Sequence, residues 1–353
     1  MAFLEFNNVT IKGLSACFPE TINENLPSET FSSRDEATPF IGSTGVERRR
    51  LADKNTTASD LCYEAAEKII SDLNWERDSI ECLILVTQTA DYILPASSCI
   101  LQERLGLPEE CYTMDISLGC SGWVYGLSVI AGLMSGGGIK RGLLLAGETA
   151  LKPSSPRDKS TWPLFGDAGT ATAVVYDPGS CGMKFHFGTD GDGYEAIIIP
   201  DGGFRNPFTE SSLEYEEVES GISRNRLQPI LNGMDVFAFG IAKAPQSINK
   251  LLDRHELNKE EIDYYIFHQA NKFMNETIRK KLKLPSDKVP YSLKDYGNTS
   301  SASIPITMVT ELKKQLQQDK VVKQIGCGFG VGLSWATVYF ETKNLVISDI
   351  VEI

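Results

Sequence analysis

Short, continuous apolar runs alternate along the chain with segments of helical periodicity. Residues 81–87 and 142–147 form such runs, each of strand length. An uninterrupted apolar run predicts a strand that is buried on both faces, which is typical of parallel sheets. Residues 57–73 instead place apolar side chains at helical spacing, behind a cap at Thr57 or Ser59. The alternation predicts an α/β sandwich with mostly parallel central strands.

The same criteria predict the remaining elements. Strands are expected at 9–16, 111–116, 170–176, 263–267 and 333–342, and helices at about 97–105, 120–134, 237–252, 273–282 and 303–316. Two pairs of segments also resemble each other, 85–90 with 266–271 and 169–176 with 332–339. This similarity predicts a duplicated chain with halves at 1–185 and 186–353. Residues 188–232, rich in glycine and charge, are expected to form an inserted loop near the functional site.

Composition excludes several classes of protein. The net charge of −13 and the pI near 4.9 oppose nucleic-acid binding. No apolar run approaches the roughly 20 residues that span a bilayer, and the first residues do not resemble a signal peptide. The eight cysteines form no Cys-x-x-Cys pair, and residues 189–193 lack the ligands of a calcium loop. We therefore expect a cytoplasmic protein with reduced thiols, no metal and no membrane contact.

Three residues far apart in the sequence lie in settings that suit one reaction. Cys120 follows a predicted strand and begins a predicted helix, whose N-terminus would stabilise a thiolate. His268 ends a predicted strand, and Asn298 lies in a loop that a glycine begins. A thiol, an imidazole and an amide can together transfer an acyl group through a thioester. The alternatives are a buried cysteine, a core histidine and an asparagine that forms a turn or an N-cap.

The glycine-rich segment 326–332 invites comparison with a dinucleotide-binding loop. A dinucleotide-binding loop lies between a strand and a helix, whereas here a strand is predicted to follow. We therefore reject that interpretation and expect a tight turn whose N–H groups face an oxyanion. Residues 165–169, Phe-Gly-Asp-Ala-Gly, are expected to form a structural loop between the halves.

These windows together resemble one family. Gly-Cys-Ser-Gly at 119–122, His-Gln-Ala-Asn at 268–271, Gly-Asn-Thr-Ser at 297–300 and Gly-Phe-Gly-Val-Gly at 328–332 are similar to ketoacyl-ACP synthase III, a condensing enzyme of the thiolase superfamily. The resemblance extends from residue 9 to about residue 340. It implies a duplicated five-layer αβαβα fold, a homodimer and an acyl carrier protein (ACP) as partner. It also implies acyl-CoA or acyl-ACP as substrates and no cofactor.

The resemblance also implies a role for each residue. Cys120 would carry the acyl group, and the backbone N–H groups of Cys120 and Phe329 would stabilise the oxyanion. His268 and Asn298 would donate hydrogen bonds to the carbonyl of a malonyl thioester during decarboxylative Claisen condensation. The implied substrate pocket includes Leu94, Phe237 and Asn271. Carrier-protein docking would use the basic residues Lys272, Arg279, Lys280 and Lys281, for which the alternative is a solvated helix face.

The chain departs from the family pattern where coenzyme A would bind. Pro39 and Ser43 replace a tryptophan and an arginine, Lys159 stands near a second arginine position, and Phe273 replaces a further arginine. These departures favour an acyl donor carried by ACP, or an unusual thioester. Leu94 replaces a phenylalanine that closes the acyl pocket across the dimer. The extra space predicts acyl groups longer than acetyl.

Three other interpretations explain part of the pattern. A related acyltransferase would pass the acyl group from Cys120 to an alcohol or an amine, without releasing carbon dioxide. A papain-like peptidase also orders cysteine, histidine and asparagine along the chain, but its local cysteine motif differs from the Gly-Cys-Ser-Gly found here. An inactive partner subunit would be expected to lack the nucleophile, whereas this chain keeps all three residues.

Overall fold

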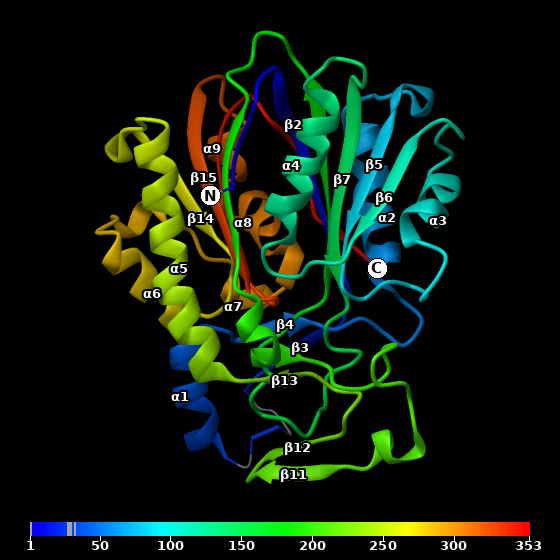
Figure 1. Cartoon of the computed structure of the whole chain (residues 1–353), viewed down its shortest axis with the longest axis vertical. Coiled ribbons are helices and arrows are strands. Elements are labelled where there is room, and N and C mark those ends of the chain that lie inside the picture. The colour runs from blue at the N-terminus through cyan, green and yellow to red at the C-terminus, as the bar shows by residue number, and fades with distance from the viewer. Residues whose placement is uncertain (1, 27–29, 32) are drawn as a thin grey trace.

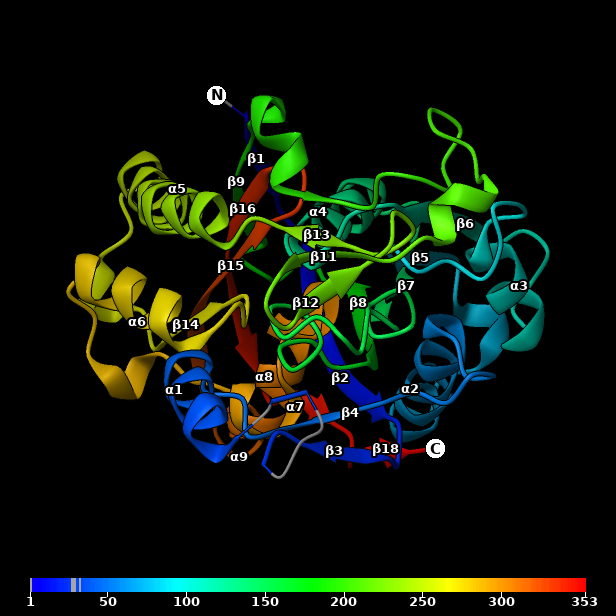
Figure 2. The same ribbon diagram turned by 90° about the horizontal axis from the view of Figure 1, so that it is seen from below.

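The protein is built from five layers of alternating helices and sheets. The computed structural model describes residues 2–26, 30–31 and 33–353. From left to right, Figure 1 shows the helices α5 (Gly233–Arg254) and α6 (Lys272–Lys281), the sheet that contains β14 (Tyr264–Phe267) and β15 (Val321–Gly330), and the central helices α4 (Gly122–Met134) and α8 (Ser303–Glu311). The sheet that contains β5 (Cys82–Val86) and β7 (Arg141–Glu148) follows, and then α2 (Ala58–Asp72) and α3 (Ser97–Arg104). Figure 2 shows the same layers from below. The predicted α/β sandwich with five layers is therefore confirmed.

The first sheet contains the apolar runs recognised in the sequence. Its strands lie in the order β17 (Val346–Ile347), β2 (Val9–Phe18), β8 (Ala168–Tyr176), β7 (Arg141–Glu148), β5 (Cys82–Val86) and β6 (Tyr112–Ile116), and β18 (Val351–Glu352) also pairs with β2. Strand β5 is parallel to β6 and β7, but β8 is antiparallel to both β7 and β2. Because β17 and β18 are also parallel to β2, only β8 among the described strands of this sheet runs against the others, and the prediction of mostly parallel strands is confirmed here.

In the second sheet most neighbouring strands are antiparallel, so the prediction of mostly parallel strands is wrong there, because an apolar run reports burial on both faces and not direction. Its strands lie in the order β1 (Ala2–Phe6), β9 (Met183–Thr189), β16 (Ser334–Lys343), β15 (Val321–Gly330) and β14 (Tyr264–Phe267). Strands β15 and β16 are antiparallel because only residues 331–333 connect them, whereas β14 and β15 are parallel. The similar segments of the sequence occupy equivalent positions, in β8 and β16 and at the ends of β5 and β14. This correspondence supports the duplication.

Six helices form the remaining layers around the sheets. They are α2 (Ala58–Asp72) and α3 (Ser97–Arg104) outside the first sheet, α4 (Gly122–Met134) and α8 (Ser303–Glu311) between the sheets, and α5 (Gly233–Arg254) and α6 (Lys272–Lys281) outside the second sheet. Helix α2 begins after Thr57, which is one of the two predicted caps. Thr57 forms a capping box with Asp60. The predicted helix 303–316 is interrupted at Leu312, where the backbone leaves the helical region before α9 (Lys313–Leu316).

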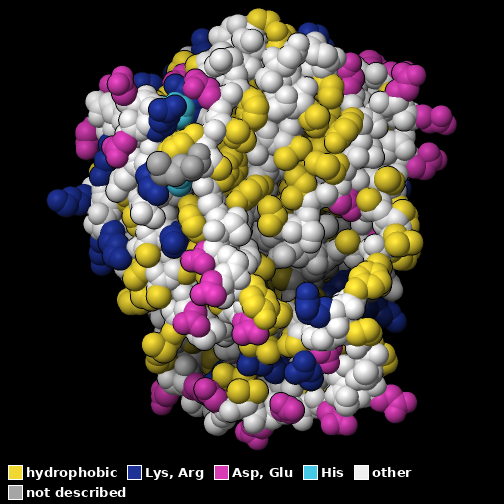
Figure 3. All heavy atoms as spheres, viewed as in Figure 1, with side chains coloured by type: hydrophobic (Ala, Val, Ile, Leu, Met, Phe, Trp, Pro, Cys, Tyr) yellow, Lys and Arg dark blue, Asp and Glu magenta, His cyan; other side chains and the backbone are white. Residues whose placement is uncertain are grey.

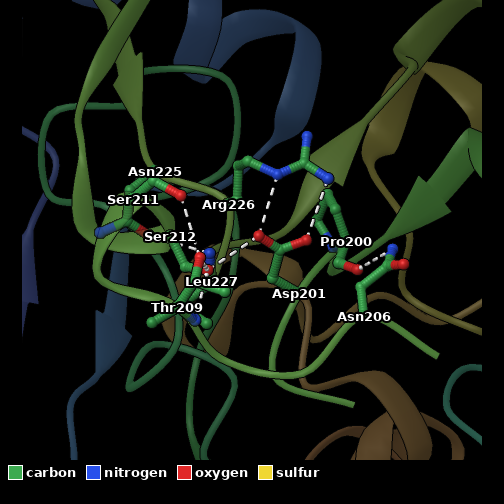
Figure 4. A network of polar contacts seen from close by, with 9 residues as sticks. All are labelled: Pro200, Asp201, Asn206, Thr209, Ser211, Ser212, Asn225, Arg226 and Leu227. Atoms are coloured by element: carbon green, nitrogen blue, oxygen red, sulfur yellow. Dashed lines mark hydrogen bonds and ion pairs between the residues drawn. The ribbon is translucent and has the colours of Figure 1, made fainter. Parts of the chain in front are cut away.

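The segment between β9 and α5 folds over one end of the molecule, beside α1 (Arg34–Thr44), β3 (Ile22–Glu24) and β4 (Arg48–Arg50) (Figure 1). It contains η2 (Gly191–Ala196), β10 (Ile197–Ile198), η3 (Glu210–Leu213), β11 (Glu216–Glu219), β12 (Ile222–Arg224) and β13 (Ile230–Leu231). Figure 4 shows how this segment is tied together. Two nitrogens of Arg226 donate to the Asp201 carboxylate at 2.9 Å, and Ser212 Oγ donates to it at 2.9 Å. These contacts connect the residues before β11 with those after β12.

All eight cysteines are free thiols. Among the residues that the structure describes, no helix is both long enough and apolar enough to cross a membrane.

Candidate active site

Cys120 lies in the turn between β6 and α4, with its side chain buried. Glycines on both sides allow this placement. A Cβ at Gly119 would lie 2.4 Å from Gln88 Oε1, and one at Gly122 would lie 2.4 Å from Val86 Cγ1. The helix begins at Gly122 rather than at Cys120, so the sulfur lies just outside the first turn. The turn therefore places the thiol at the carboxyl ends of β5 and β6.

The protonation of Cys120 differs from the sequence-based expectation of a stabilised thiolate. Burial raises the pKa of the Cys120 thiol to about 11, and the nearby Glu148 carboxylate acts in the same direction. Hydrogen bonds from the Ser300 hydroxyl and from the backbone N–H of Val331 oppose this rise only in part. The Cys120 Sγ–Ser300 Oγ distance is 3.9 Å. At neutral pH the thiol of the free protein is therefore protonated, because desolvation outweighs the hydrogen bonds that favour the thiolate.

His268 follows β14 and is buried against η6 (Ser300–Ala302) and α8. Its Nδ1 lies 2.8 Å from Ser303 Oγ, and that hydroxyl donates to the Ser300 carbonyl oxygen at 2.9 Å. Because the Ser303 proton is used in this way, the neutral imidazole carries its own proton on Nδ1. Its Nε2 is then a hydrogen-bond acceptor. Burial lowers the pKa of His268 to about 3, so the free protein holds it neutral.

Asn298 lies between α7 (Leu293–Tyr296) and η6, after Gly297 with φ of 64°. The backbone N–H of Ser300 donates to Asn298 Oδ1 at 2.9 Å. This contact is the turn contact expected from the alternative interpretation of Asn298, and it also orients the amide. The amide nitrogen has only a long contact of 3.5 Å with the carbonyl oxygen of Ala270. Asn298 Nδ2 is thus left as a donor.

Cys120, His268 and Asn298 line one cavity with a volume of about 450 Å³. Phe329, Gly330 and Glu148 also line it. The inserted segment closes the cavity with the apolar residues Ile197, Ile198, Ile199, Pro229 and Leu231. The ring of Phe329 stands edge-on to His268, with centroids 5.6 Å apart. Figure 3 shows apolar side chains gathered over the middle of this face of the molecule, with Lys and Arg side chains below them. The size and lining suit an elongated apolar ligand with a polar reacting end.

The glycine-rich segment is a strand and not the predicted tight turn. Residues 326–330 belong to β15, and the turn comprises residues 331–333. The glycines are needed because β15 passes directly over the Cys120 turn. A Cβ at Gly328 would lie 2.7 Å from the Cys120 carbonyl oxygen, and one at Gly330 would lie 2.7 Å from Cys120 Sγ. Phe329, a predicted oxyanion residue, therefore lies between two sites of close backbone approach.

Of the three predicted pocket residues, one lines the cavity and two do not. Asn271 lines the cavity, although its side chain also accepts a hydrogen bond from the Met274 N–H at 2.8 Å as the N-cap of α6. Phe237 stacks on Phe273, with centroids 5.3 Å apart, and is not a lining residue. Leu94 is 78% exposed and also lies outside the cavity of this chain.

Three of the four predicted docking residues present their charge at the surface. Lys272, Lys280 and Lys281 lie on α6, where Lys281 Nζ also donates to the Ile241 carbonyl oxygen at 3.0 Å. Arg279 differs, because its guanidinium forms an ion pair with Glu276 at 2.8 Å. The same side chain donates to a backbone carbonyl at 2.6 Å. Its charge is therefore used within the protein.

Several residues of the site were not recognised in the sequence. Ser300, Ser303 and Val331 contact the thiol or the imidazole, and Glu148 is a fully buried carboxylate in the cavity wall. Glu148 had one recognisable signal, because a charged residue at the carboxyl end of a buried strand marks a functional edge. The serines had none, since their contacts join segments distant in sequence.

Residues 114–191 match the family described as 3-oxoacyl-[acyl-carrier-protein (ACP)] synthase III, and residues 252–342 match its C-terminal region. The chain is 33% identical over 330 residues to the beta-ketoacyl-[acyl-carrier-protein] synthase III of Caldanaerobacter subterraneus subsp. tengcongensis, covering 93% of this chain and 96% of that relative. The chain belongs to the ketoacyl-ACP synthase III family. It is therefore an acyltransferase of the condensing class, as the motifs predicted.

Solved structures of ketoacyl-ACP synthases have the same fold. The 3-oxoacyl-(acyl-carrier protein) synthase from Burkholderia xenovorans LB400 is 38% identical, with a TM-score of 0.93 over 100% of this chain and 99% of its own. The synthase III from Pseudomonas aeruginosa PAO1 is 25% identical, with a TM-score of 0.81 over 96% of this chain and 100% of its own. The thiolase-like duplicated fold is thus confirmed.

Proposed function

We propose that this enzyme carries an acyl group on Cys120 and condenses it with a malonyl thioester of ACP, releasing carbon dioxide. The observation that carries the proposal is the convergence of Cys120, His268 and Asn298 on one cavity. The cavity is buried and mainly apolar, so charge that develops inside it interacts strongly with nearby donors. Carrier proteins deliver acyl groups as thioesters, which a thiol can accept in a near-isoenergetic exchange.

In the first half-reaction the Cys120 sulfur bonds to the acyl carbonyl carbon, and the bond to the leaving thiolate breaks. Because Nε2 of neutral His268 is an acceptor, it takes the thiol proton and returns it to the leaving thiolate. The backbone N–H groups of Cys120 and Phe329 stabilise the oxyanion. The products are the acyl-enzyme and a free thiol.

In the second half-reaction the malonyl carboxylate leaves as carbon dioxide, and its electron pair forms an enolate. Asn298 Nδ2 donates to the thioester carbonyl. His268 donates there from Nε2 in its protonated form, which the negative charge of the malonyl group favours. The enolate carbon then attacks the acyl carbonyl, the carbon–sulfur bond breaks, and the proton that His268 has taken up from solvent passes to the Cys120 thiolate.

The α1 region and the cavity residues of the inserted segment support a proposal for the acyl donor. Lys159, near a position where the family uses an arginine, is ion-paired with Glu36 at 2.8 Å. This pairing leaves less positive charge for the phosphates of coenzyme A. The cavity residues Ile197, Ile198 and Leu231 of the inserted segment are apolar and leave space for an alkyl chain. We therefore propose acyl groups longer than acetyl, delivered by ACP, and an acyl-chain series in which acetyl reacts fastest would contradict this.

Two surfaces support the proposed partners. The lysines of α6 offer positive charge to an acidic ACP. Strand β6 lies at the edge of the first sheet, and α3, which contacts it, begins shortly after the exposed apolar residues Tyr92, Ile93 and Leu94, which are 64%, 79% and 78% exposed. A sheet edge beside exposed apolar side chains is suited to pairing with a second copy of the chain. We therefore propose a homodimer, in which Leu94 lies close to the partner's cavity.

The test is intact-protein mass spectrometry after incubation with acyl-CoA and acyl-ACP thioesters of increasing chain length. We expect an adduct of one acyl group, larger yields from acyl-ACP, and no adduct in Cys120→Ala. Carbon dioxide release from malonyl-ACP then distinguishes condensation from acyl transfer to an alcohol or an amine. Acylation of Cys120 without carbon dioxide release would favour simple transfer. The absence of any Cys120-dependent adduct would favour an inactive partner subunit.

A further inference from the structure

Glu148 is a buried acid in the cavity wall that the steps above do not use. It ends β7, is 2% exposed, and lines the same cavity as Cys120. Its carboxylate accepts hydrogen bonds from Thr89 Oγ1 at 2.8 Å, from the Gln88 N–H at 3.0 Å and from Thr87 Oγ1 at 3.3 Å. Ser301 Oγ completes the set at 3.3 Å. Every one of these donors is neutral.

The surroundings of Glu148 destabilise its charged form. Burial raises the pKa of Glu148 to about 7, although all four donors act in the opposite direction. None of the ion pairs among the described residues includes Glu148. The titratable groups that sense its charge are Cys120, across the cavity, and Cys62 of α2. The end of β5 and η6 contribute only hydroxyl and amide groups. Glu148 therefore changes charge near neutral pH without a compensating cation.

The contacts of Glu148 also join the two halves of the site. Through Ser301 it holds η6, the segment that follows Asn298 and includes Ser300 beside the thiol. Through the backbone N–H of Gln88 it also holds the residues that follow β5. The side chain of Gln88 in turn lies against Gly119. One carboxyl group thus sets the spacing between the loop of the nucleophile and the loop of the amide.

We propose that Glu148 is a positioning residue of the condensation step and that it acts in its uncharged form. It holds the Asn298 loop beside Cys120, and its bound proton keeps the cavity neutral when the malonyl carboxylate enters. The inference rests on the proposed function. Two carboxylates in one buried cavity repel each other, so an ionised Glu148 opposes binding of the second substrate. It also raises the pKa of the Cys120 thiol.

The direction of the pH effect follows directly. Below pH 7 Glu148 is mainly protonated and the cavity accepts the malonyl group, whereas above pH 7 it ionises and condensation slows. In the limit where only the protonated form works, the rate falls about tenfold per pH unit above that pKa. Glu148→Gln keeps the shape and removes the charge, so this fall should disappear. Glu148→Asp keeps the charge and shortens the side chain, so the fall should remain, with a lower rate throughout.

The experiment starts from enzyme already acylated at Cys120 and measures carbon dioxide release from malonyl-ACP in a single turnover between pH 6 and 9. Wild type, E148Q and E148D are compared, and their thermal unfolding is recorded. A flat profile for E148Q beside a falling one for wild type supports the proposal. Identical profiles for wild type and E148Q overturn it. If wild type is never acylated, it is the proposed function that fails.

A second measurement needs no substrate and separates the two failures. The rate of Cys120 alkylation by iodoacetamide reports the fraction of thiolate. At pH 8 we expect E148Q to react about three- to tenfold faster than wild type, which corresponds to a thiol pKa lower by roughly half a unit to one unit. Equal rates overturn the proposal. If E148Q does not fold, the wild-type profile decides: an inflection near pH 7 supports the proposal, and a single thiol ionisation overturns it.

Discussion

Gly330→Ala tests whether the position of the Cys120 thiol is set by β15. An added Cβ at Gly330 would lie 2.6 Å from Cys120 Cβ and 2.7 Å from Cys120 Sγ. Ordinary contacts between such atoms are about 3.5–4.0 Å, so either the strand or the thiol must move by roughly 1 Å. Gly330 does not have a positive φ, so the effect is steric rather than conformational.

The expected magnitude follows from that displacement. A shift of about 1 Å in a reacting group costs roughly 100-fold in rate. Overpacking of a buried site costs about 1–3 kcal/mol of folding free energy, which is a fall of only a few degrees in Tm for a chain of this size. G330A should therefore remain folded and lose most of its activity.

The assay is the initial rate of acyl adduct formation on Cys120, followed by intact mass, with Tm measured on the same samples. Gly203→Ala is the matched control, because a Cβ there would meet nothing within 4 Å. It should acylate at the wild-type rate. A G330A protein that acylates as fast as wild type, at an unchanged Tm, would refute the idea that β15 fixes the thiol.

Ser303, His186 and the lysines of α6 can be tested in the same way. Ser303→Ala removes the partner of His268 Nδ1, so the tautomer with an acceptor at Nε2 is no longer favoured, and Cys120 acylation should slow about tenfold, measured by intact mass. Burial lowers the pKa of His186 to about 4, so its contribution to stability is present above pH 6.5 and is lost as pH falls toward 4; urea denaturation should show a loss of about 2 kcal/mol between pH 7 and pH 5 that is smaller in His186→Asn. Charge reversal at Lys280 and Lys281 should reduce turnover with ACP thioesters more than turnover with small thioester analogues, and equal reductions would contradict the docking role.

The elements were predictable where local sequence determines them. Helix α2 has a cap and regular apolar spacing, and β5 and β7 are apolar throughout, so their existence followed from periodicity. The mostly parallel direction was predicted correctly for the first sheet but not for the second, because direction depends on the connections between strands. The error at residues 326–330 has a similar cause: glycine usually marks a turn, but here it allows β15 to cross the Cys120 turn at short range.

The site was predictable to the extent that each motif is contiguous. Cys120, His268 and Asn298 lie in short windows whose chemistry is visible along the chain, whereas Ser303 matters only because α8 begins beside the end of β14. For Glu148 the position at the end of a buried strand was visible in the sequence, but the contacts were not. Its role depends on contacts with β5 and with Ser301, more than 150 residues away in sequence. Such contacts are set by the fold and leave no local pattern.

The duplication explains why the chemistry lies between the halves. The ends of β5 and β14 occupy equivalent positions, and each is followed by a glutamine, Gln88 or Gln269, at its second residue. Only the second half has a histidine there, while the first half has Thr87, which donates to Glu148. The two halves therefore supply different groups from one backbone plan: an imidazole and an amide from one, a thiol and a carboxyl group from the other. A reaction that needs an acceptor, a donor and a controlled charge in one cavity requires that divergence, because two identical halves would place like groups opposite each other.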